Sequence, residues 1–151
     1  MSQSNVPITI LLADDDPDDR LMAQEAFSES LLRNPLMMVE DGEQLLDYLR
    51  GNGRWADSKP AKPGLILLDL NMPRMDGREA LREIKNDPDL RRIPVVILTT
   101  SKAEEDIVRA YDLGVNSFIS KPVTFDQLVD VMKYVGRYWL EIVELPSGAN
   151  H

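Results

Sequence analysis

Residues 8–20 read ITILLADDDPDDR, and this stretch contains the change of pattern that decides the fold. The unbroken apolar run at its start is typical of a short strand buried on both faces of a sheet. Five aspartates then fill most of positions 14–19 around Pro17, a residue that suits the first turn of a helix. Like charges this close together destabilise a fold unless protons or cations compensate them. The stretch therefore predicts a strand, a charged site and a helix in succession.

The alternation of strand and helix continues along the chain. Four further strands are predicted, at 35–41, 64–73, 93–101 and 117–120. Five helices are predicted from spacing and end signals, at 18–32, 43–50, 77–86, 103–113 and 124–145. Gly51 is expected to end the second helix, and Thr124 to cap the last. We expect an α/β fold, a five-stranded parallel sheet with helices on both faces.

Composition limits the class of protein. The chain has 151 residues, 43% hydrophobic and 28% charged, which is the size and balance of one globular domain. That domain is expected at 8–145, with disordered ends at 1–7 and 146–151. Residues 51–63, rich in Gly, Pro and polar side chains, are predicted to form a surface loop.

Charge and the reactive residue types exclude several functions. A net charge of −9 disfavours a nucleic-acid partner, because binding a phosphate backbone needs clustered Lys and Arg. No signal region or membrane span is recognisable, so we expect a cytoplasmic protein without a membrane partner. The chain has no cysteine, and its one histidine, His151, is the last residue. Carboxylates, hydroxyls and lysines are the reactive groups that remain.

Polar side chains follow the predicted strands, at the edge where ligands bind in a parallel sheet. After the first, third, fourth and fifth strands these are Asp14–Asp16, Asp69 with Asn71, Thr99–Ser101, and Lys121. Asp14, Asp15 and Asp69 are expected to converge, with Lys121 as a fixed positive charge. Oxygen ligands without His or Cys suit a hard divalent ion, Mg²⁺ or alternatively Mn²⁺.

A carboxylate beside such an ion and a lysine can act as a nucleophile toward phosphorus. The two positive charges would stabilise the transferring phosphoryl oxygens, which is most of what this chemistry requires. Asp69 is the predicted nucleophile because it ends the central buried strand. Thr99 offers a hydroxyl that can donate a hydrogen bond to an acyl phosphate oxygen.

Four segments, LLADDDP, LILLDLNMPRMDG, VVILTTS and SFISKP, together resemble the receiver domain of two-component response regulators. The resemblance covers roughly residues 7–140 and implies a flavodoxin-like, CheY-like fold with strand order 2-1-3-4-5. It implies that Asp69 is the phosphoacceptor and that Lys121 bonds the phosphoryl group. The metal ligands that it implies are Asp14, Asp15, Asp69 and the backbone carbonyl of Asn71.

The resemblance also implies a switch and a reaction. Thr99 matches the switch hydroxyl, Phe118 the aromatic side chain that turns inward with it, and Asn71 and Ser101 the positions that tune dephosphorylation. The implied reaction is phosphoryl transfer from a phosphohistidine on a partner sensor histidine kinase to Asp69, followed by changed protein–protein contacts and self-catalysed hydrolysis. Such a protein is a signalling phosphoacceptor rather than an enzyme with separate substrates.

Two segments narrow the resemblance. DGEQLLDYLRG at 41–51 and YWLEIVELP at 138–146 look like the small stand-alone response regulators paired with bacterial and cyanobacterial phytochrome kinases. A bacterial phytochrome is therefore the expected kinase partner.

Simpler interpretations compete at several positions. Asp16, Asp18 and Asp19 are predicted only to begin a helix, Asp16 as its N-cap and the others through the helix dipole. Taken alone, Thr99 could be a core hydroxyl and Lys121 a solvated loop lysine. Phe118 fits ordinary half-buried packing equally well, since its switch role comes from the resemblance alone.

The last predicted helix has more apolar surface than a sheet needs. A stripe of Phe125, Leu128, Met132, Val135, Trp139 and Ile142 is expected to face the sheet. A second row beside it consists of Val131, Tyr134, Tyr138 and Leu145. Because such a row favours an exposed interface, we expect a homodimer through this helix. Burial of the row by the rest of the chain is the alternative.

Two other function classes compete with a phosphoacceptor. An aspartyl-phosphate phosphatase usually has a second acid two residues after its nucleophile, where this chain has Asn71, and a substrate-capping insertion that we do not find. A receiver-like scaffold that never turns over phosphate is disfavoured by the presence of Asp69, Thr99 and Lys121.

Overall fold

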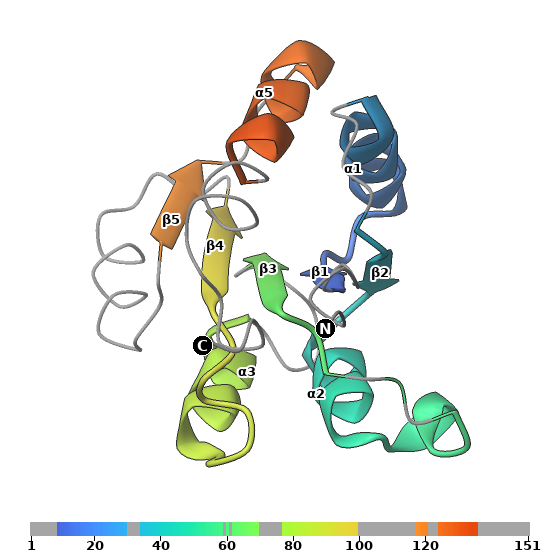
Figure 1. Ribbon diagram of the computed structural model, residues 1–151, viewed down its shortest axis with the longest axis vertical. Helices are drawn as coiled ribbons and strands as arrows, with labels where there is room; N and C mark the ends of the chain where they lie inside the picture. Colours follow the sequence, from blue (N-terminus) through green and yellow to red (C-terminus); the bar gives the residue numbers. More distant parts are fainter. Residues whose placement is uncertain are drawn as a thin grey trace, which may run out of the picture.

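A five-stranded parallel sheet forms the centre of the protein, seen here in a computed structural model (Figure 1). The structure describes residues 9–29, 34–58, 60, 62–69, 77–99, 117–120 and 124–135. The strands are β1 (Ile10–Ala13), β2 (Leu36–Val39), β3 (Leu65–Asp69), β4 (Val95–Thr99) and β5 (Ser117–Ser120). Their order is β2-β1-β3-β4-β5, which confirms the predicted topology.

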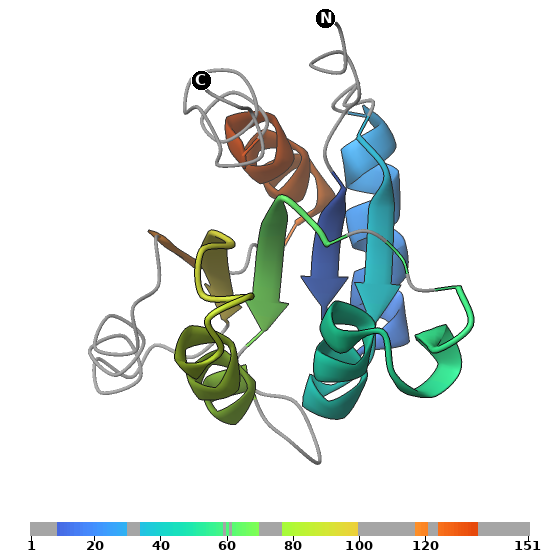
Figure 2. The ribbon, with the colours of Figure 1, turned by 60° about the horizontal axis from the view of Figure 1, so that its bottom comes forward.

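Helices cover both faces of this sheet. On one face lie α1 (Pro17–Glu29) and α5 (Phe125–Val135), and on the other lie α2 (Gly42–Arg50) and α3 (Gly77–Asn86) (Figures 1 and 2). The predicted helix at 103–113 lies outside the described residues. So do positions 136–145 of the last predicted helix and the two ends of the chain, 1–7 and 146–151.

The apolar strands divide the core into two layers. Alternate residues of a strand point to opposite faces, so Leu11 and Ala13 belong to the layer under α2 and α3, whereas Ile10 and Leu12 belong to the layer under α1 and α5. All four are essentially inaccessible to solvent. The same burial in β1 and β3 explains why these two strands contain no polar position until they end.

The ends of α2 and α5 follow from local hydrogen bonds. Asp41 is the N-cap of α2 and accepts a 2.8 Å bond from the Gln44 N–H, while the Gln44 side chain accepts a 2.9 Å bond from the Glu40 N–H. Gly51 ends α2 in the left-handed conformation, at φ 68°. Thr124 accepts a 3.2 Å bond from the Gln127 N–H, so both end signals seen in the sequence are confirmed.

The segment after α2 is mostly exposed, as expected for the predicted surface loop, but part of it is regular. Gly53–Trp55 form a short 3-10 helix, and the half-buried Trp55 ring packs edge-on against Tyr48 with ring centroids 5.3 Å apart. Gly53 has φ 57°, and a Cβ there would lie 2.7 Å from Oδ2 of Asp47. Periodicity could not indicate the half-burial of Trp55, because a lone aromatic residue among polar neighbours has none.

The sheet-facing stripe of α5 starts later than the spacing predicts. Leu128, Val129 and Met132 are buried, but Phe125 keeps 37% of its surface exposed. Val131 is half-buried and packs against the core layer under α1 and α5. Tyr134 is 51% exposed, whereas Tyr138 and Leu145 lie outside the described residues.

Burial of Tyr48 predicts a loss of stability in alkali. Desolvation raises the pKa of Tyr48 above its ordinary value of about 10. The stability that depends on the protonated phenol is therefore complete below about pH 10 and is lost as the pH rises toward the folded-state value, because the unfolded chain ionises first. We expect Tyr48→Phe to flatten the decline in the free energy of unfolding above about pH 10, measured by urea denaturation. Tyr134→Phe is the control at an exposed tyrosine, and equal slopes for Tyr48→Phe and the unmodified protein would contradict the prediction.

Candidate functional site: an acidic cluster at the carboxyl edge of the sheet

Strand register brings the predicted site residues to one edge of the sheet. Ala13 of β1 pairs with Leu68 of β3, so Asp14 follows at the level of Asp69, the last residue of β3. Asp69 in turn pairs with Leu98, one residue before the end of β4. The carboxyl ends of three adjacent strands therefore meet where the sequence predicts a site.

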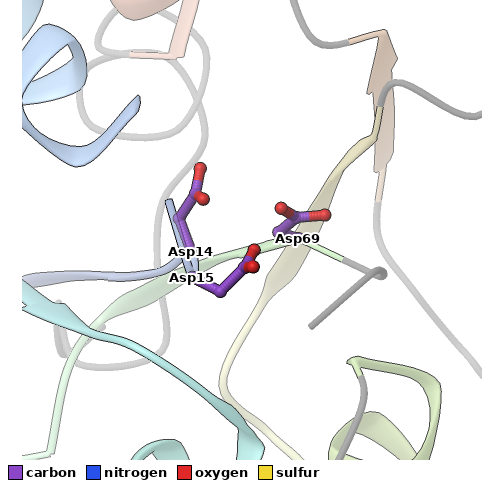
Figure 3. A group of neighbouring side chains, drawn as sticks. All are labelled: Asp14, Asp15 and Asp69. Atoms are coloured by element: carbon purple, nitrogen blue, oxygen red, sulfur yellow. The ribbon is translucent and has the colours of Figure 1, made fainter. Parts of the chain in front are cut away.

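Three carboxylates form the centre of this edge. Asp14, Asp15 and Asp69 each offer an oxygen, and these oxygens all lie within 4.8 Å of one another (Figure 3). Asp14 is 2% exposed and Asp69 is 6% exposed, whereas Asp15 is exposed to solvent. The predicted convergence of the three acids is thus confirmed, with Asp15 on the solvent side of the cluster.

The backbone around Asp14 is held by three hydrogen bonds. The Asp16 N–H donates to Oδ1 of Asp14 at 3.0 Å, and the Asp14 N–H donates to the carbonyl of Val39 at 3.1 Å. Nη1 of Arg20 donates to the carbonyl of Asp14 at 2.7 Å. Side chain and main chain of Asp14 are therefore both oriented before any ligand arrives.

The remaining acids of this stretch begin α1, as predicted. Oδ1 of Asp16 accepts hydrogen bonds from the N–H groups of Asp18 at 2.9 Å and Asp19 at 3.4 Å. Asp18 and Asp19 lie in the first turn, where a negative charge complements the helix dipole. The main chain of Asp16 also orients Asp14, so this residue supports the cluster without belonging to it.

The donor set fits a magnesium-like ion. All three side chains offer carboxylate oxygens, and oxygens bound to Mg²⁺ at about 2.1 Å from the ion lie about 3 to 4 Å apart. Oxygens within 4.8 Å of one another need only small side-chain rotations to reach that geometry. Two nearly buried carboxylates beside a third also have a strong electrostatic reason to take up a cation.

The other predicted site residues are described in part or not at all. Thr99 and Phe118 are placed in β4 and β5 by their backbone, with Thr99 opposite Ser120 in the register. Asn71, Ser101 and Lys121 lie outside the described residues. Sequence reasoning missed the contribution of Arg20 to the site geometry, because its contact with Asp14 depends on how α1 leaves the sheet.

Comparison with known proteins identifies the class. The family model for the response regulator receiver domain matches residues 10–133. The chain therefore belongs to the response regulator receiver domain family of two-component signalling.

Within this family the chain is similar to phytochrome response regulators. It is 41% identical to the response regulator Rcp1 of Synechocystis sp. over 145 residues, which cover 96% of this chain and 97% of Rcp1. A crystal structure of the phosphorylated cyanobacterial phytochrome response regulator RcpA matches with a TM-score of 0.85 and 44% identity, over 93% of this chain and 99% of that one. The Mn²⁺-bound form of Rcp1 matches with a TM-score of 0.84 and 41% identity, over the same shares.

None of the helices within the described residues has the length and apolar character needed to cross a bilayer.

The hydrogen bonds of Asp16 predict a stability effect that separates capping from charge. Asp16→Ala is expected to lower the free energy of unfolding by about 1 kcal/mol, because the first turn of α1 loses its cap. Asp16→Asn removes the same charge but keeps a capping oxygen, so it should remain within about 0.3 kcal/mol of the Asp16 protein. Urea denaturation in the presence of EDTA measures both, and equal stabilities of the two variants would refute the capping role.

Proposed function

We propose that this protein is the phosphoacceptor of a two-component pathway and that Asp69 receives the phosphoryl group. The observation that carries the proposal is the cluster of Asp14, Asp15 and Asp69 at the end of the central strands, in a chain of the receiver family. The donor is a phosphohistidine on a sensor histidine kinase. The phytochrome response regulators to which the chain is similar support a bacterial phytochrome as that kinase.

The transfer exchanges one bond to phosphorus for another. A carboxylate oxygen of Asp69 attacks phosphorus, the O–P bond forms, and the P–N bond to the kinase imidazole breaks, with the nitrogen taking a proton as it leaves. Asp14 and Asp15 would hold Mg²⁺ or Mn²⁺ together with Asp69 and the backbone carbonyl of Asn71. Such an ion, when bound, supplies positive charge to the phosphoryl oxygens. Support for the metal comes from the all-oxygen donor set and from the Mn²⁺-bound form of Rcp1.

The remaining roles are assigned from membership of the receiver family. Thr99 ends β4 beside Asp69 and is assigned the hydroxyl that bonds a phosphoryl oxygen and switches position. Phe118 in β5 is assigned the aromatic residue that follows this movement, and Lys121 is assigned the ammonium partner of the phosphoryl group. Asn71 and Ser101 are assigned to the tuning of hydrolysis, which the protein catalyses on itself and on no separate substrate.

We further propose a homodimer through the outer surface of α5. Tyr134 is 51% exposed there, although Val131 is already half-buried against the core. An aromatic side chain with this exposure suits the centre of a protein interface. The row that includes Tyr134 continues in the sequence to Tyr138 and Leu145.

The phosphoacceptor assignment predicts the loss of labelling in one variant. Asp69→Asn should abolish acid-labile phosphate, because an amide cannot form the acyl phosphate, when a radiolabelled acyl phosphate or a phosphorylated cognate kinase is the donor. Asp57→Asn, at an exposed position after α2, is the matched control and should label normally. Undiminished label on Asp69→Asn would overturn the assignment. Rapid multiple turnover of the donor without a labelled protein would instead favour a phosphatase.

The metal assignment predicts that neighbouring aspartates behave differently. Asp15→Asn should weaken Mg²⁺ binding at least tenfold in isothermal titration calorimetry, because the cluster loses a ligand as well as a charge. Asp16→Asn removes the same charge one position later and should change the affinity less than about threefold. Equal losses in both variants would show that net charge, and not ligation, determines the affinity.

The dimer assignment predicts that a surface change can abolish the dimer without disturbing the fold. Tyr134 and Tyr138 replaced together by glutamate should give a monomer in sedimentation velocity, because two like charges per subunit would meet across the interface. The circular dichroism spectrum should stay unchanged, since Tyr134 is exposed. A dimer that persists in the double variant would refute this interface.

A further inference from the structure

Arg20 contacts the acidic loop although none of the proposed chemistry uses it. It lies in the first turn of α1, and its side chain is only 17% exposed. Nη1 donates to the carbonyl of Asp14 at 2.7 Å, and Nη2 lies 3.8 Å from Oε2 of Glu40. The guanidinium thus bridges the loop after β1 and the loop after β2.

We propose that Arg20 is a positioning residue of the metal site, an inference that rests on the proposed metal binding by Asp14 and Asp15. The carbonyl of Asp14 belongs to the peptide group that joins these two residues. Fixing the plane of this peptide sets the direction in which the chain enters Asp15. Asp15 is exposed, so packing contributes little to its orientation and the backbone has to supply it.

The short contact to the carbonyl matters more than the ion pair. A charge-assisted hydrogen bond of 2.7 Å to a nearly buried residue is strong, because few water molecules compete for either group. The pair with Glu40 spans 3.8 Å and the Glu40 side chain is 55% exposed, so solvent screens it. Glu40 also donates its N–H to Oε1 of Gln44 in α2, but this bond fixes the main chain of Glu40 and not the carboxylate that faces Arg20.

A purely electrostatic role and a positioning role predict opposite effects of Arg20 on metal affinity. A positive side chain next to a cation site repels the ion, so its removal would strengthen binding if electrostatics were its only role. Removal of a residue that orients the ligands weakens binding, and outer-shell partners of this kind typically change metal affinity about 10- to 100-fold. The direction of the change therefore separates the two roles.

The test is isothermal titration calorimetry, which measures the Mg²⁺ affinity of the full chain in the unmodified protein and in four variants. Arg20→Gln is expected to bind about tenfold more weakly. Arg20→Lys keeps the charge but not the planar fork, and it is expected to bind about three- to tenfold more weakly. Because Arg20→Lys leaves the net charge unchanged, it can test the positioning role even if Arg20→Gln does not fold.

The controls separate position from charge and from general stability. Glu40→Gln leaves the bond to the Asp14 carbonyl intact and should stay within about twofold in affinity. Arg50→Gln removes the same charge at the end of α2, where Arg50 pairs with Glu83 at 3.2 Å and Asp87 at 3.7 Å, and should leave the affinity unchanged. Thermal unfolding in EDTA reports stability independently of the metal.

The outcomes separate this inference from the function on which it rests. Mg²⁺ affinity in the Arg20 variants that is equal to or higher than in the unmodified protein would overturn the positioning role alone. A lower melting temperature in EDTA with an unchanged dissociation constant would do the same, because it would make Arg20 a merely structural residue. Absence of Mg²⁺ binding by the unmodified protein would overturn the metal site itself, and the positioning role with it.

Discussion

The repulsion among three carboxylates at one edge of the sheet is the constraint on which the site depends. Parallel pairing of β1 with β3 brings Asp14 level with Asp69, and Asp15 follows on the solvent side. A fold driven only by burial would not place acids there, because their desolvation opposes folding. Asp14 accepts hydrogen bonds from Asp16 and Arg20 and donates one to the carbonyl of Val39, and these bonds hold this unfavourable arrangement in place, ready for a cation.

Much of the fold could be predicted because the strands leave little ambiguity. Runs such as 65–69 are buried on both faces, so they have no polar position to confuse the pattern, and acids mark their ends. Tertiary placement was harder to predict. Trp55 lies in a polar segment and becomes half-buried because its ring packs against Tyr48 of α2 and the core layer to which Tyr48 belongs. Phe125 fits the apolar stripe of α5 by spacing yet remains partly exposed as the first residue of the helix.

The acidic cluster shows the same division between local and distant information. Asp14 and Asp69 were predictable since each is the first acid at the end of a buried strand. The N-cap role of Asp16 was predictable because a cap depends only on the next three residues. Arg20 was not, since a basic residue in a first turn is ordinarily solvated and its direction depends on where β2 lies. Family membership then ties the cluster to two-component signalling, which charge and spacing alone do not specify.

The unequal exposure of the three acids has a kinetic consequence. Asp14 and Asp69 are almost fully buried and Asp15 is exposed, so, as far as the described residues go, an ion held by the three acids would be closed off on the core side and open to water at Asp15. Entry or exit past Asp15 would not require the sheet or its covering helices to open. Exchange of the ion by this route would be uncoupled from unfolding, because it needs only the rotation of the exposed Asp15 side chain and the exchange of water molecules. Side-chain rotation is much faster than the opening of a core, so a site built in this way would reload on a much shorter timescale than any unfolding event.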